Sequence, residues 1–600
     1  MTAVASQRLV RAASLPELRD AGRLVAHVDG HVLCLFADRD EVHAVDNRCP
    51  HMGFPLHRGS VADGILTCHW HHARFDLCSG GTFDQWADDL RRFPIEIRGD
   101  EIYVDLSPRG DATAHQRKRL QDGLERNIAL VLAKATIALT EADPTGVDAF
   151  RAGLEFGVVR RGAGWGRGLT TLVCFMNLAP RLAPADVPVA FYLGLAEVAE
   201  ESTGDPPRFP LDPLPSGGAT PAQLGRWLRR FVEVRDTEGA ERAIVSAVRA
   251  GASETELADM LFAAASDHRY LEFGHALDFT NKAFEALDVA GWEHAEAVLA
   301  SVPAQIAAAT RMEEENSWRN PVDLVSLLED AFARLPDVLD AGRARRGSWR
   351  GRAQLLESVL ADDPAASVEA LLDALDSGAT EVELASAVAF AAATRIARFP
   401  TTNEFGDWDT ALHTFTFANA VEQGLRRSSS PALLRGVFDA AMSVYVDRFL
   451  NVPATRLPAP HLEAEPDSLL GELPGLLDRQ QQIDEAAQLV ASYLGSSGDP
   501  DALVAALGSA LVRENRNFHT IQCVEAAVRQ YELLRGTEDA SLPLVAAARY
   551  LAAHATTTRS QRQTFDIARR LHRGERLYEL DESEYNEGRG APSKVPSNGG

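Results

Sequence analysis

Two cysteines and two histidines that could bind metal stand in two short stretches near the start of the chain. The first stretch is Cys49-Pro-His51, and the second, separated from it by sixteen residues, is Cys68-His-Trp-His71. These ligands suit a [2Fe-2S] cluster in which Cys49 and Cys68 hold one iron and His51 and His71 hold the other. Replacing two thiolates by neutral imidazoles removes negative charge, so such a cluster has a higher reduction potential than an all-cysteine cluster.

The residues around these ligands favour tight loops. Gly53, Pro55, Gly59 and Gly64 allow turns that direct backbone N–H groups at the sulfurs, and hydrogen bonds of that kind tune the potential of a cluster. Zinc accepts the same four ligands, so a structural Cys2His2 zinc site is the alternative for this part of the chain.

The region from about residue 7 to 106 resembles the Rieske ferredoxin and Rieske oxygenase family. The stretch HRGSVADGILTCHWHHARFDLCSGG has the family's order of glycine, strand, ligand loop, Phe-Asp and glycine. The resemblance implies a [2Fe-2S] cofactor on the four ligands above and an electron-donating reductase or ferredoxin as partner. His72 stands where the family usually has glycine. The loop with Phe54 has no extra cysteine for the disulfide of the respiratory-complex type, which favours the ferredoxin-like branch.

The hydrophobic pattern changes after this region. Short β-rich runs such as HVLCLFAD and a hairpin pattern, IEIRGDEIYV, give way to apolar residues at three- and four-residue intervals, which is helical periodicity. We therefore expect a multidomain protein. An all-β domain at residues 1–106 is followed by a linker at 107–118, a large all-α domain with internal repeats at 119–580 and a disordered tail at 581–600.

Composition limits the partners. The chain has 600 residues, 46% of them hydrophobic and 24% charged, and a formal net charge of −26. An acidic chain repels phosphates and acidic membrane surfaces, so we expect neither nucleic acid nor membrane as a partner. No apolar run reaches the ~18 residues of a membrane span, and the start lacks the apolar stretch of a signal peptide, so the cytoplasm is the expected compartment.

The helical region repeats itself. GASETELADMLFAAASDHR and GATEVELASAVAFAAATRI lead to HALDFTNKAFEAL from His275 and HTFTFANAVEQGL from His413. Both second segments have His at the first position, Phe at the fifth, Asn at the seventh and Leu at the thirteenth. A weaker third copy leads to His519, and we expect a fourth, without the histidine, from LTTLVCFMNLAPRL to FYLGLAEVAEE. Packed around one axis, such helices could bring these histidines together.

A second candidate metal site lies in DHRYLEFGHALDFTNKAFEAL, residues 267–287. On a continuous helix His268, His275 and Lys282, seven residues apart, share one face, and Asp278 is one turn after His275. Two histidines and a carboxylate are a usual ligand set for non-haem Fe(II). We therefore consider His268, His275, His413 and His519 as ligands, with Asp278 or Lys282 supplying the anionic one.

Lys282 is unusual because the chain has only four lysines, against 56 arginines. A buried lysine amine can be deprotonated, and it could then take up CO2 and bind metal as a carbamate. The alternative is a lysine that reaches toward solvent and pairs with Glu285, Asp278 or Glu272.

The Asp-x-x-His-x-x-x-x-His pattern of ordinary Rieske oxygenases is absent from the sequence. The pattern Asp-His…Phe-Gly-His-Ala-Leu-Asp-Phe is instead similar, more distantly, to the questin-oxidase-like helical oxygenases. That resemblance implies an all-helical oxygenase that uses iron held by several histidines to oxidise aromatic or polyketide-like substrates. We expect the cluster to supply electrons to a mononuclear iron in this domain, which activates O2. The rival hypothesis is an electron-transfer or redox-sensing module on a non-catalytic helical scaffold. Whether the chain forms a homo-oligomer is left open.

Overall fold

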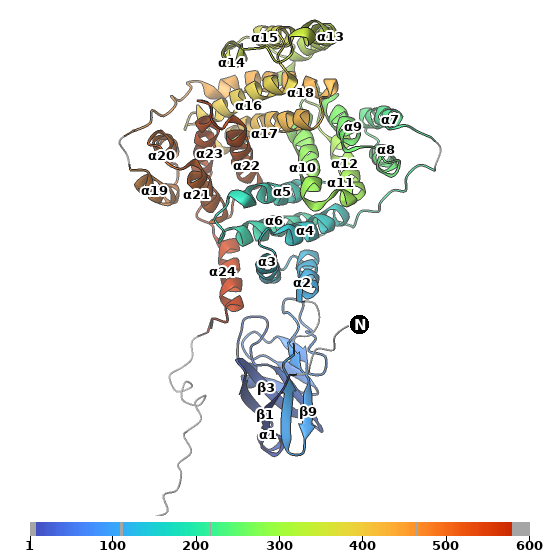
Figure 1. The fold of residues 1–600 in the computed structure, drawn as a ribbon, viewed down its shortest axis with the longest axis vertical. Helices are drawn as coiled ribbons and strands as arrows, with labels where there is room; N and C mark the ends of the chain where they lie inside the picture. Colours follow the sequence, from blue (N-terminus) through green and yellow to red (C-terminus); the bar gives the residue numbers. More distant parts are fainter. Residues whose placement is uncertain (1–7, 108–111, 216–217, 463–464, 579–600) are drawn as a thin grey trace, which may run out of the picture. The chain divides into compact units, whose positions relative to one another are not determined.

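The computed structural model describes residues 8–107, 112–215, 218–462 and 465–578. It confirms the expected fold class, because a β-rich N-terminal part is followed by helices throughout the rest of the described chain (Figure 1). The chain divides into two compact units. The first comprises the chain up to Arg119, Ala133–Ile137 and the chain from Thr564 onward, and the second comprises Leu120–Leu132 and Ala138–Gln563.

The strands of the first unit form three antiparallel sheets, with the orders β1-β10-β9, β2-β3-β4-β8 and β5-β6-β7. One short helix, α1 (Leu15–Ala21), precedes β2. The strands are β1 (Leu9–Ser14), β2 (Arg23–Val28), β3 (His31–Asp38), β4 (Glu41–Asp46), β5 (Ser60–Ala62), β6 (Ile65–Thr67), β7 (Arg74–Asp76), β8 (Arg92–Phe93), β9 (Ile95–Arg98) and β10 (Glu101–Asp105).

The predicted hairpin and core of this unit are present. Strands β9 and β10 pair with Ile97 opposite Ile102, and Gly99, with φ of 59°, forms the turn between them. One of the two apolar clusters contains Cys49 and Cys68 together with buried residues such as Phe75. The two cysteines are therefore anchored in a core rather than in a mobile surface loop.

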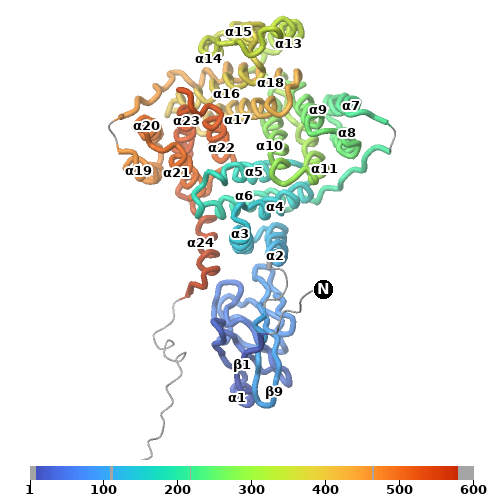
Figure 2. The backbone as a smooth tube through the Cα atoms, viewed as in Figure 1, coloured from blue at the N-terminus to red at the C-terminus, as the bar shows by residue number. Residues whose placement is uncertain are grey.

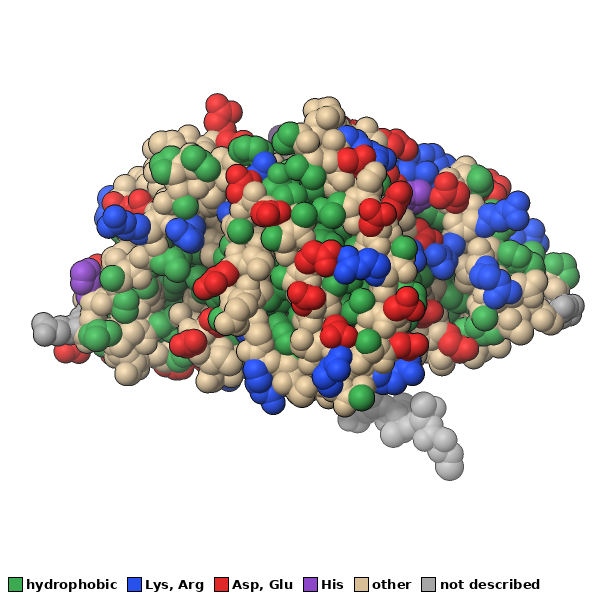
Figure 3. All heavy atoms as spheres, turned by 90° about the horizontal axis from the view of Figure 1, so that it is seen from above, with side chains coloured by type: hydrophobic (Ala, Val, Ile, Leu, Met, Phe, Trp, Pro, Cys, Tyr) green, Lys and Arg blue, Asp and Glu red, His purple; other side chains and the backbone are tan. Residues whose placement is uncertain are grey.

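The helices of the described chain after the strands are α2 (Ala112–Arg126), α3 (Ala129–Ala142), α4 (Val147–Arg160), α5 (Arg167–Leu178), α6 (Val187–Ser202), α7 (Pro221–Glu233), α8 (Thr237–Arg249), α9 (Glu254–Ser266), α10 (His275–Ala290), α11 (Ala295–Ala300), α12 (Pro303–Ala308), α13 (Leu324–Gly342), α14 (Arg352–Leu360), α15 (Pro364–Asp376), α16 (Glu381–Ala397), α17 (Phe405–Arg427), α18 (Pro431–Val446), α19 (Pro466–Asp478), α20 (Ile483–Gly495), α21 (Pro500–Val512), α22 (Phe518–Leu534), α23 (Ser541–Ala553) and α24 (Ser560–His572). None of the described helices combines the length and apolarity that a membrane span requires. Acidic and basic side chains are interspersed on the face of the helices drawn in Figure 3.

Two of the expected boundaries need comment. The segment 107–118, whose composition indicates a linker, includes the first turns of α2, which begins at Ala112. A polar stretch can still form a helix, because most of its side chains remain solvated on the helix surface. The expected tail at 581–600 lies outside the described residues.

Four helices form a closed ring in the second unit. Helix α5 contacts α10 and α22, and α17 contacts the same two helices, so the four make the sides of a square (Figures 1 and 2). Helices α10, α17 and α22 are the second helices of the three predicted repeats, and each is preceded by the first helix of its repeat, α9, α16 or α21. The ring therefore brings equivalent repeat positions toward one axis.

Local sequence explains the matching starts of the first two repeats. Ser253 caps α9 and Thr380 caps α16, and each forms a reciprocal capping box with a glutamate three residues later, Glu256 or Glu383. These side chains satisfy backbone N–H groups that a helix start otherwise leaves unpaired.

The fourth copy differs from the expectation. The sequence predicts the helix of LTTLVCFMNLAPRL, α5, as the first helix of this copy and α6 as the second. In the structure α5 itself lies in the ring, which is the place of a second helix. Thr171-Leu-Val-Cys-Phe175-Met-Asn177 also matches the second helices of the first two repeats, with Phe at the fifth position and Asn at the seventh. The histidine position of this copy is Thr171.

A buried ionic cluster joins three sides of the ring. The ammonium of Lys282 on α10 lies 2.9 Å from a Glu285 carboxylate oxygen and 2.7 Å from one of Glu525 on α22. The amide of Asn177 on α5 donates to both carboxylates, at 2.7 and 2.8 Å. Because the Lys282 side chain is only 1% exposed, these charges depend on one another rather than on water.

We predict that Lys282→Met lowers the free energy of unfolding by about 3–5 kcal/mol, because it removes the buried cation that Glu285 and Glu525 share and leaves only Arg529, 3.9 Å from Glu285, beside them. Arg343→Met is the control, since Arg343 pairs with Asp340 with side chains 77% and 70% exposed, and it should cost less than about 0.5 kcal/mol. Chemical denaturation of the full chain measures both. Equal effects of the two substitutions would contradict the interdependence of the buried charges.

Candidate metal centres

The two predicted ligand loops of the first unit have the same backbone closure. The N–H of Cys49 donates to the carbonyl of Phe54, and the N–H of Cys68 donates to the carbonyl of Ala73, both at 2.8 Å. Each loop is thus closed across five residues, with the cysteine at its base. The second loop connects β6 to β7, whose pairing fixes both of its ends.

The two sulfurs face each other and are surrounded by backbone donors. The Cys49 and Cys68 thiols are within hydrogen-bonding distance, and the N–H groups of Trp70 and His71 point at the Cys68 sulfur. The hydrogen bond from Cys49, helped by these N–H groups, outweighs burial and lowers the pKa of Cys68 to about 6. The same hydrogen bond and burial raise the pKa of Cys49. This is an environment that stabilises negative charge on sulfur, as metal-bound thiolates require.

The two imidazoles stand beside the sulfurs. The rings of His51 and His71 are 5.0 Å apart at their centroids and nearly perpendicular. The Nδ1 atom of His51 is buried without a hydrogen-bond partner, and burial, with Lys134 and His71 nearby, lowers the pKa of His51 to about 4. A neutral imidazole with a buried, unused nitrogen is costly unless that nitrogen binds a ligand. The donor set and this nitrogen fit a [2Fe-2S] cluster.

A lysine supports the first ligand loop. Lys134 donates hydrogen bonds from its ammonium to the carbonyls of Pro50, at 2.6 Å, and His51, at 2.8 Å, and it pairs with Asp88 at 3.2 Å. The positive charge is thus fixed by the backbone of the loop that carries Cys49 and His51. No sequence motif had indicated it, because Lys134 lies 83 residues after His51 in the chain.

Aromatic rings enclose the same loops. Trp86 packs against His51 at 4.6 Å between ring centroids, and Trp70 packs against His71 at 4.3 Å. Tyr578 contacts Phe54 at 5.5 Å. His72 has a φ of 62°, in the left-handed region that favours glycine, which explains why the resembling family has glycine at this position.

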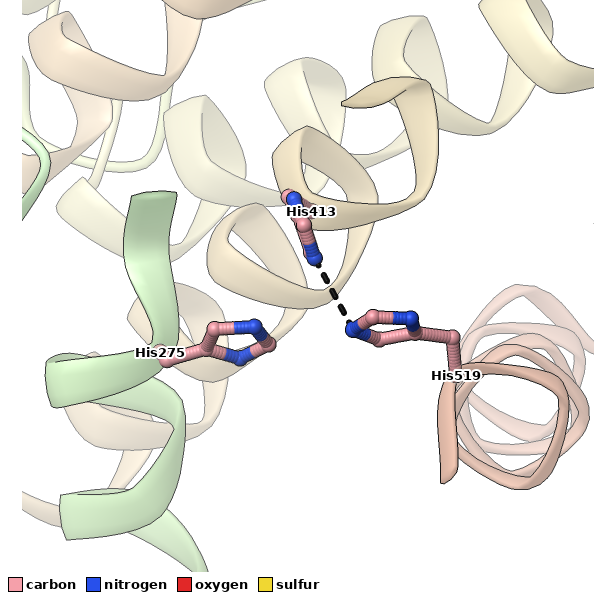
Figure 4. Close-up of side chains that lie close together, drawn as sticks. All are labelled: His275, His413 and His519. Carbon is pink, nitrogen blue, oxygen red and sulfur yellow. Dashed lines mark hydrogen bonds between the residues drawn. The ribbon is translucent and has the colours of Figure 1, made fainter. Parts of the chain in front are cut away.

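Three of the predicted histidines meet in the second unit. His275 on α10, His413 on α17 and His519 on α22 each offer a ring nitrogen, and these nitrogens lie within 4.8 Å of one another. The Nε2 atoms of His413 and His519 are 3.0 Å apart, and the three rings point toward one another from three helices (Figure 4). Two nitrogens that are each about 2.1 Å from one ion and about 90° apart have a similar separation of about 3 Å. Within the described part of the chain, this is the one group of three or more His, Cys, Asp or Glu side chains with ligand atoms close enough together to hold one ion.

The environment keeps two of these rings, His275 and His413, neutral. Burial and the neighbouring imidazoles lower the pKa of His275 to about 2, and burial and His519 lower the pKa of His413 to about 4. The lone pairs of neutral imidazoles are available to a metal near neutral pH.

A carboxylate that the sequence analysis missed supports the third ring. Asp409 Oδ2 lies 3.4 Å from Nδ1 of His519, and Tyr550 donates to its other oxygen. Burial alone would raise the pKa of Asp409, but contacts with His519, His554 and Tyr550 hold it well below its usual range. A carboxylate behind a histidine fixes the ring and strengthens it as a ligand. The sequence did contain an indication of this carboxylate, because Asp409 precedes His413 by one turn of α17.

His268 lies elsewhere, and its assignment as a ligand of this group is corrected. Its Nδ1 is 2.6 Å from Glu313 and its Nε2 is 2.9 Å from Glu233. The prediction assumed a continuous helix from His268 to Lys282, whereas α9 ends at Ser266 and the backbone then enters the left-handed region at Tyr270. This break removes the seven-residue relation between His268 and His275.

Asp278 and Lys282 are also outside the three-histidine group. Asp278 accepts a hydrogen bond of 2.5 Å from Gln522, and burial raises its pKa to about 7. Burial disfavours the ammonium of Lys282, but Glu285 and Glu525 outweigh it and hold the pKa of Lys282 above its usual value. A charged ammonium does not form a carbamate, so Lys282 is a buried ion-pair partner. The expected pairing with Glu285 is present, but without the expected reach toward solvent.

A cavity of about 790 Å³ opens beside the three histidines. His275 and His519 line it together with the aromatic rings of Phe279 and Phe518. Its lining also includes Glu197, whose pKa is raised to about 6 by burial and by Glu200 nearby, and the guanidinium groups of Arg161 and Arg167. The cavity lining therefore combines aromatic rings with charged groups of both signs.

We predict that the full chain binds one divalent metal ion, such as Fe(II), at the three histidines. His275→Ala should weaken this binding at least about 10-fold, because it removes one of the three nitrogen ligands. His268→Ala is the matched control and should leave the affinity unchanged, since His268 is held by Glu313 and Glu233. Isothermal titration together with elemental analysis measures the binding. Equal affinities of the His275→Ala and wild-type proteins would contradict the site.

Comparisons with known proteins concern the first centre. Residues 8–93 match the family profile described as Rieske [2Fe-2S] domain. The chain is 27% identical over 103 residues to the ferredoxin component of the naphthalene 1,2-dioxygenase system of Pseudomonas aeruginosa, covering 17% of this chain and 99% of that protein. It is 38% identical over 79 residues to human apoptosis-inducing factor 3, covering 13% of this chain and 13% of that protein.

Among solved structures, the ferredoxin of carbazole 1,9a-dioxygenase from Nocardioides aromaticivorans IC177 matches with 27% identity and a TM-score of 0.16. The match covers 16% of this chain and 98% of that ferredoxin. The family profile and the naphthalene dioxygenase ferredoxin both match the N-terminal region that carries Cys49, His51, Cys68 and His71. These two matches favour the cluster over the zinc alternative. Residues 8–93 of this chain are therefore a Rieske [2Fe-2S] domain.

Proposed function

We propose that the chain is an oxidoreductase with two metal centres. The Rieske domain receives electrons from a reductase or ferredoxin, and the helical unit uses them at a mononuclear Fe(II) site for O2-dependent oxidation of a small molecule. The observation that carries the proposal is the approach of His275, His413 and His519 to within 4.8 Å of one another beside a cavity of about 790 Å³.

The ligand set supports a catalytic rather than a structural metal. Three imidazoles leave coordination positions open, which structural sites do not. Imidazole suits Fe(II), and the carboxylate of Asp409 behind His519 supplies negative charge without occupying a position on the metal. Iron in this site would supply O2 activation, and the cluster would supply electrons one at a time.

The cavity supports a substrate with an apolar body. Phe279 and Phe518 line the cavity close to His275, so an aromatic or polyketide-like ring would bind there by apolar contact. Glu197, with a pKa of about 6, lines the same cavity and can take up or release a proton near neutral pH.

One observation favours the rival function, an electron-transfer or redox-sensing module on a non-catalytic scaffold. The 3.0 Å separation of the Nε2 atoms of His413 and His519 is also that of an N–H···N hydrogen bond between two neutral rings. In that case the histidines stabilise the ring of helices and bind no metal.

The iron content and the consumption of O2 distinguish the two functions. We predict about three irons per chain in protein purified without oxygen, two of them in the cluster. His275→Ala should retain the cluster's EPR signal after reduction, lose the third iron and lose most substrate-dependent O2 consumption. A wild-type protein that holds only the two cluster irons after incubation with Fe(II) would support the rival function.

A second prediction concerns the potential of the cluster. Lys134→Met should lower it, on the order of tens of millivolts, because the ammonium beside Pro50 and His51 stabilises the extra negative charge of the reduced state. Arg39→Met removes the same charge from a side chain that is 76% exposed, and it should have a much smaller effect because water screens it. A redox titration followed by EPR measures both. Shifts of equal size would show that the position of Lys134 has no special influence.

A further inference from the structure

The ring of helices places equivalent residues in layers. Asp278 on α10 and Gln522 on α22 each lie three residues after the histidine of their repeat, His275 or His519. The amide of Gln522 donates a hydrogen bond of 2.5 Å to Asp278. The α5 residue at this position is Cys174. Burial raises the pKa of its thiol, and the charges of Lys282, Glu525 and Asp278 act on it through space, so Cys174 faces the side chains that α10 and α22 direct into the ring.

The next layer repeats the arrangement. Six residues after the histidine position, Asn177 on α5 donates to Glu525 on α22 at 2.8 Å. One turn of α5 separates Asn177 from Cys174, and a further turn separates Cys174 from Thr171. Asn177 and Cys174 both face α10 and α22, and Arg167, one turn before Thr171, lines the same cavity as His275 and His519. From this we infer that Thr171, which occupies the histidine position of its repeat, is directed toward the three histidines.

The hydroxyl of Thr171 is unusual for a buried threonine inside a helix because it forms no hydrogen bond. Thr171 is fully buried, and its Oγ1 has no hydrogen-bond partner. Two other buried threonines of the ring use theirs locally. Thr170 donates to the carbonyl of Gly166 at 2.9 Å, and Thr280 donates to that of Ala276 at 2.7 Å. A buried hydroxyl that makes no such bond is costly, so its position indicates a partner that the protein chain does not supply.

We propose that Thr171 marks the open side of the histidine group, where its hydroxyl holds a small exogenous ligand, water or dioxygen, by a hydrogen bond. The inference rests on the proposed metal centre and names the position at which its exogenous ligand binds. A histidine at this position would add a fourth nitrogen and close the site. The shorter threonine side chain leaves space for a small molecule and retains a donor to orient it. Thr171 is thus a positioning residue, and the departure of this repeat from the histidine pattern has a function.

Azide binding to the Co(II)-loaded full chain tests this, because azide is a small ligand that accepts a hydrogen bond. The oxidised cluster is diamagnetic, so the EPR signal of high-spin Co(II) reports on the histidine site alone. Thr171→Val keeps the shape and removes the hydroxyl. It should take up Co(II) as wild type does and bind azide about 10-fold more weakly, the effect of one lost hydrogen bond. Thr171→Ser should restore most of the affinity.

Two further variants complete the experiment. Thr280→Val removes a buried hydroxyl that is bonded to its own helix, and it should leave azide affinity unchanged. Thr171→His should retain Co(II) and lose azide binding, because the added imidazole fills the open side. Full Co(II) uptake with equal azide affinity in wild type and Thr171→Val would overturn the role of Thr171 alone. A wild type that takes up no Co(II) would overturn the metal centre and, with it, this inference.

Discussion

The structure of the helical unit depends on a buried cation shared between two carboxylates. Lys282 on α10 pairs with Glu285 and with Glu525 on α22, and Asn177 on α5 donates to both acids. These groups cannot be solvated at their depth, so each needs its partners in place. Because Lys282 and Glu525 lie about two turns along α10 and α22 from His275 and His519, the geometry that satisfies the charges also constrains the separation of these two imidazoles. Stability and the candidate metal site therefore rest on the same helix crossings.

The two centres are encoded in different ways. In the Rieske domain, each pair of ligands lies within four consecutive residues, and local backbone hydrogen bonds from Cys49 and Cys68 close the loops. The spacing of the sequence therefore determines most of the geometry. In the helical unit, His275, His413 and His519 are more than 100 residues apart in sequence, and only the packing of the repeats brings them together. A change in the packing of one repeat would displace its histidine without any change in a local motif.

This difference explains what could be predicted. The four candidate Rieske ligands followed from residue type and spacing, and the repeat pattern indicated which three histidines share a position. His268 was misplaced because periodicity cannot detect the left-handed residues Tyr270, Glu272 and Phe273 that interrupt the helix. Lys134 and Asp409 were missed because they contact a candidate ligand residue, His51 or His519, without binding metal themselves. Such contacts depend on tertiary packing. Equivalence between repeats was thus a better guide to the site than the face of a single helix.

Repetition also explains how an asymmetric site can arise in a pseudo-symmetric ring. Four equivalent helices offer four positions around one axis, and identical residues at all four would give a closed, symmetric set. Here three positions carry imidazoles and α5 carries Thr171, while Asp409 supports only His519. Each departure from the repeat makes one side of the layer chemically distinct from the others. The cavity that reaches His275 and His519 lies beside the start of α5, at Arg167, so the departure in sequence and the opening in structure involve the same helix.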